Sequence, residues 1–101
     1  MTDRFESFSG FYPFYLSEHS TLWCRRMHFI GSSFVLVSLS MFLATGQVLW
    51  FVAMPVSGYG FAWIGHFYFE KNKPATFKYP IYSLMGDWAM FRDIIVGKVK
   101  L

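Results

Sequence analysis

The chain has 101 residues and a net charge of +3; 54% of its residues are hydrophobic and only 15% are charged. Soluble domains carry about 25% charged residues, so this composition argues against a soluble protein and predicts one all-α membrane domain over residues 1–101. The single cysteine excludes an internal disulfide. The amino terminus lacks the cationic region and apolar run of a signal peptide, so we expect the membrane segments to stay uncleaved.

Residues 1–26 are the first segment of this domain, and they are rich in phenylalanine and tyrosine. Aromatic rings with polar edges accumulate in the headgroup region of a bilayer. Gly10 and Pro13 interrupt the segment, which is too short to span. We therefore predict a short interfacial helix that leads into a turn near Ser17 to Thr21.

Residues 27–69 contain no Asp, Glu, Lys or Arg, and this length allows two crossings of roughly 20 residues each. Thr45-Gly46-Gln47 is the natural break, because this cluster is polar and weakens a helix. We therefore predict a transmembrane helical hairpin with arms of about 18 residues, each roughly 27 Å long. Pro55 should kink or break the second arm, because proline lacks a donor and collides with the preceding turn.

Residues 70–101 are predicted to form a loop followed by a second interfacial helix between Gly86 and Gly97. This stretch places large apolar residues on one face, with Arg92 and Asp93 opposed. Basic residues flank both arms of the predicted hairpin. The positive-inside rule therefore predicts a multi-pass protein with both termini in the cytoplasm.

The three histidines of the chain, His19, His28 and His66, all fall at the same predicted membrane boundary. Equal hairpin arms return His28 and His66 to one depth, and Glu70 shares a helical face with His66. Ionisable groups at membrane depth are costly and usually functional. Imidazole and carboxylate are ligands of non-haem Fe(II), manganese or zinc, so these four residues are candidate metal ligands.

Other interpretations of these residues stay open at this point. A histidine at a helix end can cap a carbonyl, bind a lipid phosphate or ligate haem. Glu70 can pair with Lys71 or Lys73 in water, Asp87 can cap a helix, and Cys24 fits a packing role. Nucleotide-binding loops, zinc cysteine clusters and nucleic-acid motifs are absent from the sequence, so no nucleic-acid partner is expected.

Four stretches of the sequence are similar to one known family. They are FYLSEH at 14–19, RRMHFIG at 25–31, GYGFAWIGHFYFEKNKPATFKYP at 58–80 and SLMGDW at 83–88. The chain resembles the 2-hydroxy fatty acid dioxygenase family typified by the yeast enzyme, and in particular its short bacterial members. The core of the resemblance consists of Gly65, His66, Phe69, Glu70, Pro74 and Ala75.

The resemblance implies a membrane-embedded, Fe(II)-dependent dioxygenase that uses O2 to shorten a 2-hydroxy fatty acid by one carbon, an α-oxidation step. The histidines of that family are regarded as its iron ligands, and they match His19, His28 and His66. Glu70 matches the acidic position after the last of them. A bacterial inner membrane is the localisation that the resemblance suggests.

Two hypotheses follow for the function. In the first, the protein is an enzyme whose iron is held by the three histidines, with Glu70 as a fourth ligand or an orienting group. The candidate substrate-binding residues are Arg25, Arg26 and Lys71 for the carboxylate, and Trp63, Phe67 and Phe69 for the acyl chain. In the second, the protein is a non-enzymatic membrane protein that binds lipid headgroups or a larger complex. Two crossings enclose little space, so we expect a site at an interface or between protomers. A homo-oligomer is therefore a further alternative.

Overall fold

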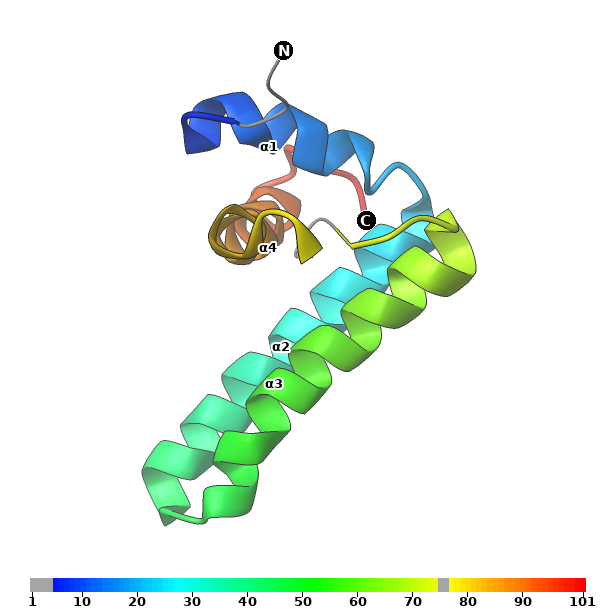
Figure 1. The fold of residues 1–101 in the computed structure, drawn as a ribbon. Helices are drawn as coiled ribbons and strands as arrows, with labels where there is room; N and C mark the ends of the chain where they lie inside the picture. The colour runs from blue at the N-terminus through cyan, green and yellow to red at the C-terminus, as the bar shows by residue number, and fades with distance from the viewer. Residues whose placement is uncertain (1–4, 75–76) are drawn as a thin grey trace.

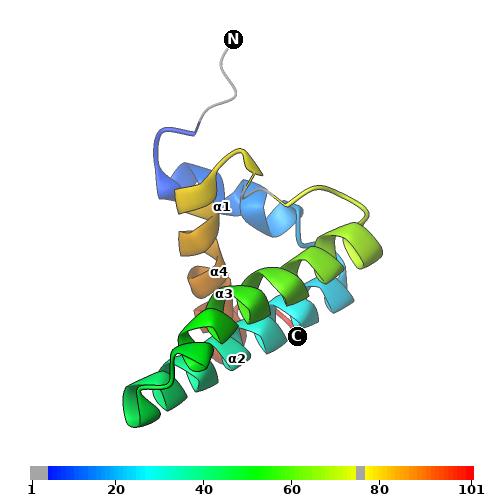
Figure 2. The ribbon, with the colours of Figure 1, turned by 60° about the horizontal axis from the view of Figure 1, so that its bottom comes forward.

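The computed structural model describes residues 5–74 and 77–101, which form helices and no strand. Two long helices lie side by side and run in opposite directions, and two shorter helices gather at one of their ends (Figures 1 and 2). In chain order the elements are α1 (Phe8–Ser17), α2 (Leu22–Thr45), α3 (Val48–Trp63), the π-helix η1 (Ile64–Glu70) and α4 (Pro80–Ile95).

The long helices are separated at the break that the sequence predicts. α2 ends at Thr45 because Gly46 adopts the left-handed conformation, with φ of 70°, and its N–H donates to the Phe42 carbonyl at 2.8 Å. α3 begins at Val48, directly after Gln47. α2 and the continuous segment of α3 and η1 are each long and apolar enough to cross a membrane.

Pro55 does not break α3, so of the kink or break expected from the sequence only a kink stays a prediction. Residues Val48–Trp63 are continuous α-helix with Pro55 inside. Proline removes one backbone hydrogen bond, and the helix continues beyond it to a segment that packs closely on α2. A Cβ atom added at Gly31 would lie 2.9 Å from Cβ of Phe61, and the rings of Phe34 and Phe61 stack with centroids 5.5 Å apart. The irregular part of this arm is η1, which was not predicted.

α1 packs its aromatic face against α4 in what we call the α1–α4 layer. Phe11 and Tyr15 are buried together with Met90 and Ile94 of α4. The helix continues through Pro13, and the hydroxyl of its N-cap residue Ser7 accepts from a backbone N–H. The aromatic residues of the first segment therefore form the core of this layer, a role that headgroup anchoring alone did not predict.

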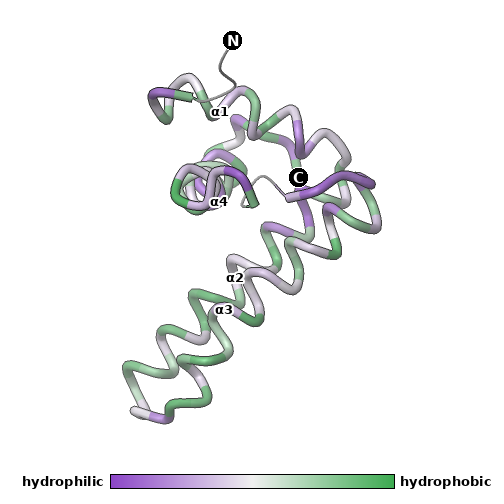
Figure 3. The backbone as a smooth tube through the Cα atoms, viewed as in Figure 1, coloured by the Kyte–Doolittle hydropathy of each residue, from purple (hydrophilic) through white to green (hydrophobic). Residues whose placement is uncertain are grey.

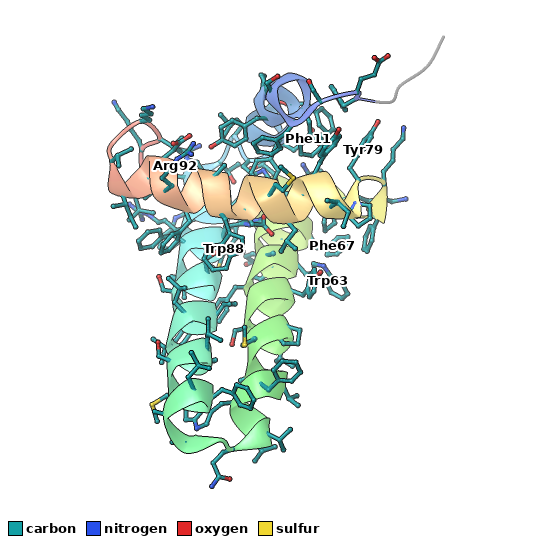
Figure 4. The ribbon with its side chains drawn as sticks, turned by 90° about the vertical axis from the view of Figure 1, so that its left-hand side faces the viewer. Phe11, Trp63, Phe67, Tyr79, Trp88 and Arg92 are labelled. Carbon is teal, nitrogen blue, oxygen red and sulfur yellow. The ribbon has the colours of Figure 1, made fainter. Side chains whose placement is uncertain are left out.

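α4 is longer than predicted, because it begins at Pro80 and not near Gly86. Proline is favoured in the first turn of a helix, where its missing N–H costs nothing. Asp93 was expected on the polar face, but it is only 5% exposed and accepts a hydrogen bond of 2.8 Å from the Tyr12 hydroxyl. α4 thus lies across the ends of α2 and α3, with α1 on its outer side (Figure 4).

Apolar and polar residues are separated along the molecule. α2 and α3 are mostly apolar away from the α1–α4 layer, whereas hydrophilic residues gather near that layer and in the loop after η1 (Figure 3). Large apolar side chains such as Leu43 and Leu49 are 74% and 77% exposed. The ionisable residues therefore gather at the end of the long helices that carries the α1–α4 layer.

Candidate metal centre

Three histidine side chains meet where the α1–α4 layer covers the long helices. His19 comes from the turn between α1 and α2, His28 from α2 and His66 from η1. They are 1%, 6% and 1% exposed. Their Nε2 atoms form a triangle with sides of 3.0, 3.0 and 3.1 Å. The structure therefore brings together the three histidines that the sequence predicted to converge.

The second ring nitrogen of each histidine faces an oxygen atom. Carbonyl, amide and carboxylate oxygens accept hydrogen bonds, so we infer that each Nδ1 carries the proton and that each Nε2 presents a lone pair. The facing pairs are His19 with the Tyr15 carbonyl at 2.6 Å, His66 with Oδ1 of Asn72 at 2.8 Å and His28 with Oδ1 of Asp87 at 3.4 Å.

Three converging lone pairs repel one another unless a cation lies among them. Nitrogen ligands that bind one ion at about 2.1 Å and at right angles to each other lie about 3.0 Å apart, which matches the triangle. A cavity of about 20 Å³ adjoins all three rings. Burial, and next the neighbouring His28 and His66, hold the pKa of His19 well below its usual range, so this ring is neutral, as ligation requires. The residues therefore fit a divalent metal ion.

Cys24 adjoins the histidine centre as well. Its Sγ and one ligand atom from each of the three histidines all lie within 4.8 Å of one another. The side chain is fully buried and packs against η1, where a Cβ added at Gly65 would lie 3.2 Å from Sγ. Cys24 thus has the packing role that the sequence left open, and it is also within reach of the centre.

Glu70 lies outside this group and fixes the turn between α1 and α2. Its Oε1 accepts from the Ser20 hydroxyl at 2.7 Å, and its Oε2 accepts from the N–H and the hydroxyl of Thr21 at 2.7 and 2.6 Å. These bonds tie the end of η1 to the residues that follow His19. The geometry therefore favours an orienting role for Glu70 over a role as fourth ligand.

The π-helix η1 positions His66 together with Asn72. The carbonyl of His66 accepts from the backbone N–H of Lys71 and, at 2.9 Å, of Asn72, and Lys71 ends the helix with φ of 60°. The amide nitrogen of Asn72 donates to the Glu18 carbonyl at 3.2 Å, so its oxygen faces His66. Such π-helical turns occur frequently at functional sites, where they redirect side chains.

Asp87 connects α4 to the centre. It faces His28 and also accepts a hydrogen bond from the hydroxyl of Tyr15, whose ring stacks on His19 with centroids 4.0 Å apart. Burial, followed by the Asp87 charge, raises the pKa of Tyr15, which keeps this hydroxyl protonated as a donor. α4 comes close here because position 86 is glycine: an added Cβ would lie 2.7 Å from the Tyr15 ring. Asp87 is therefore not a helix cap.

The cationic residues predicted to bind substrate have other contacts in this structure. Arg25 donates from Nη1 to the carbonyls of His19 and Ser20 at 3.0 and 2.9 Å, and from Nε to the Lys100 carbonyl at 2.9 Å. It therefore fixes the turn that carries His19. The guanidinium of Arg26 lies over the ring of Trp23, and Lys71 donates to the Tyr68 carbonyl.

The aromatic residues predicted to line the acyl path divide into two groups. Trp63 lines the small cavity beside the histidines, and its ring contacts that of Phe67 with centroids 6.4 Å apart (Figure 4). Phe69 instead stacks on Trp23, with centroids 5.9 Å apart. Only Trp63 of the three thus adjoins the centre.

Sequence reasoning missed four residues of the centre. All four lie within stretches that carry the family resemblance, and this resemblance was the only signal in the sequence that could have identified them. They are Tyr15, Asn72, Ser83 and Asp87. Ser83 lines the small cavity and is 4% exposed, and its hydroxyl has no hydrogen-bond partner among the residues that the structure describes. Ala75, part of the same resemblance, lies outside the described residues.

Comparison with known proteins agrees with this resemblance. The sequence profile of the family described as 2-hydroxy-palmitic acid dioxygenase Mpo1-like matches residues 5–99, a range that contains every residue of the histidine centre. No curated protein and no solved structure matches the chain significantly. The chain belongs to the Mpo1-like family of 2-hydroxy-palmitic acid dioxygenases.

Proposed function

We propose that this protein is a membrane-embedded, Fe(II)-dependent dioxygenase that shortens a 2-hydroxy fatty acid by one carbon in an α-oxidation step. The observation that carries the proposal is the buried triangle of Nε2 atoms with sides of 3.0 to 3.1 Å. The family description supports a dioxygenase and a 2-hydroxy fatty acid as its substrate class. The chemistry of three imidazoles supports the iron.

His19, His28 and His66 would hold the metal. When bound by three imidazoles on one face, Fe(II) keeps open positions, which is the arrangement that supports O2 chemistry at non-haem iron. Asn72 and Asp87 keep two of the rings in the tautomer and orientation that ligation requires. The α1–α4 layer covers the centre and excludes bulk water from it.

The residues around the small cavity can bind the polar end of a 2-hydroxy acid. The hydroxyl of Ser83, which has no hydrogen-bond partner within residues 5–74 and 77–101, can donate to a carboxylate or hydroxyl placed in this cavity. Arg25 and Lys71 act less directly, because Arg25 holds the turn that carries His19 and Lys71 lies at the end of η1. Arg26, half-buried at the same end of α2, is a candidate for attracting the carboxylate from the membrane surface.

We further propose that α2 and the segment Val48–Glu70 form a transmembrane hairpin, with α1 and α4 at the interface. Only 22% and 11% of the most apolar windows of these helices are buried in the protein, which leaves apolar surface for lipid. The basic residues lie at the end that carries the histidines, so both termini would be cytoplasmic, in a bacterial inner membrane. This places the centre at the depth where the headgroup of an amphiphile lies.

Metal analysis combined with mass spectrometry tests the proposal. The detergent-purified protein is loaded with Fe(II) without oxygen and then supplied with 2-hydroxypalmitic acid and O2. We expect one iron per chain and the acid one carbon shorter. His28→Ala should lose both while helical content is kept, whereas Ser38→Ala, a buried polar residue further along α2, should keep both.

Three results would contradict the proposal or part of it. A wild-type protein that folds but retains no iron and forms no product would favour the non-enzymatic membrane protein. A Soret band in the purified protein would indicate haem ligated by the histidines. Product formation by His28→Ala at the wild-type rate would contradict the ligand role of His28.

A further inference from the structure

A larger cavity lies beside the histidine centre, between α2, α3 and α4. Its volume is about 290 Å³, close to the lower end of the range of roughly 300–1,000 Å³ that is typical of ligand pockets. α2 contributes His28, Ser32 and Val35 to its wall. These residues lie on one face of the helix and span about 10 Å along its axis. The cavity therefore extends from the centre towards the middle of the long helices.

The wall of this cavity changes from polar to apolar along its length. His28 and Asp87 line its upper end, whereas Val35, Met54 and Pro55 line the end farther along the long helices. His28 and Asp87 also line the small cavity beside the three imidazoles. The two cavities therefore adjoin at the histidine centre. The small cavity is polar, and the larger one continues from it into an apolar space.

The side of the cavity between α3 and α4 opens to the surroundings of the helices. Tyr59 of α3 and Leu84 of α4 line it and are 47% and 53% exposed. Trp88, one turn after Leu84, lies below α4 against the long helices (Figure 4). If the long helices cross the bilayer, this opening faces lipid, so an amphiphile can enter without leaving the membrane.

We propose that this cavity binds the acyl chain of the 2-hydroxy acid next to its polar end, with the chain running along α2 from His28 towards Val35. The proposal rests on the proposed function for the identity of the headgroup. It differs from the predicted path along Trp63 and Phe67, which are 43% and 49% exposed and do not line this cavity. An apolar occupant fits because the inner wall offers an acyl chain apolar contacts and no charged side chain.

Two glycines of α3 provide a matched test. Gly58 lines the cavity, and a Cβ there would lie 3.3 Å from Cγ2 of Val35, whereas a Cβ at Gly60 meets nothing within 4 Å. Gly58→Leu should fill the inner part and weaken binding of 2-hydroxypalmitic acid about tenfold, or about 1.4 kcal/mol, while leaving 2-hydroxybutyric acid unchanged. Gly60→Leu should change neither. Equal affinities of the two variants for the long acid would overturn the proposal.

A second measurement does not depend on turnover or on the folding of Gly58→Leu. A 2-hydroxypalmitic acid brominated on its chain should quench the fluorescence of Trp88 in the metal-free protein, and Trp88→Phe gives the baseline from the other tryptophans. Met54→Phe fills the same inner space and should reduce this quenching. Quenching that is the same in wild type and Trp88→Phe would overturn the proposal. Quenching by Trp88 without any product under Fe(II) and O2 would support the cavity and contradict the proposed function.

Discussion

Asp87→Asn tests whether α4 tunes the metal centre. One oxygen of Asp87 lies 3.4 Å from Nδ1 of His28 and also accepts from the Tyr15 hydroxyl, and both of these partners are buried. Removal of a carboxylate that orients a metal-binding histidine typically lowers metal affinity about 10- to 100-fold, which is about 1.4 to 2.8 kcal/mol. We expect an effect in this range, because the amide can still accept from Tyr15 but no longer offers its charge to His28.

The same helix offers a matched control. Asp93 accepts from the Tyr12 hydroxyl at 2.8 Å, so Asp93→Asn also weakens an aspartate–tyrosine bond between α4 and α1, but it touches no histidine. The assay is an anaerobic Fe(II) titration against a competing chelator, with thermal unfolding measured in parallel. The reasoning is refuted if Asp87→Asn binds Fe(II) as tightly as wild type, or if Asp93→Asn loses as much affinity.

Three further predictions concern stability and are measured by thermal unfolding of the metal-free protein in detergent. The pKa of His19 is lower in the folded state than its usual value of 6.5, so stability should be full above pH 6.5 and fall as the pH drops below it; a stability independent of pH below 6.5 would contradict this. Gly31→Ala should destabilise by about 1 to 3 kcal/mol through overpacking against α3, whereas Gly60→Ala should stabilise by about 1 kcal/mol through helix propensity; equal changes would argue against close packing at Gly31. Ser83→Ala should stabilise by about 1 kcal/mol, because it removes a buried hydroxyl without a partner among the described residues; a loss of stability would show that this hydroxyl has a partner.

The helices and the meeting of the histidines could be predicted because they follow from local pattern and length. A charge-free run interrupted once by Thr45-Gly46-Gln47 specifies two helices of similar length, and glycine at 46 ends the first one. His28 and His66 lie nearly equal distances from that break, so antiparallel helices return them to one level. The prediction needed only the rise per residue of a helix.

The partners of the histidines could not be predicted in the same way, because they depend on how α4 crosses the long helices. Pro80 lies before the predicted start of the helix at Gly86 but is the first residue of α4. The additional turns place Ser83 at the small cavity. Asp87 then lies in mid-helix, beside His28 and Tyr15, where it cannot act as a cap. No local pattern specifies such a contact between residues far apart in the chain.

Helical spacing left two roles open for Glu70, fourth ligand or orienting group. His66 and Glu70 both lie in η1, four residues apart, but a shared helical face does not determine where a flexible carboxylate points. The carboxylate instead binds Ser20 and Thr21. Glu70 therefore stabilises the turn that carries His19, although it lies in the same helix as His66.

The origin of the three histidines in separate segments links metal binding to the packing of the whole protein. His19 belongs to the turn below the α1–α4 layer, whereas His28 and His66 belong to the long helices. An ion bound by all three would therefore hold the layer onto the helices, in addition to Asp87, Arg25 and Glu70. A ligand that binds only the assembled state stabilises it by about 2.7 kcal/mol at a concentration 100 times its Kd. Because α4 also forms one wall of the larger cavity, an ion at the three histidines would also stabilise that wall of the proposed acyl site.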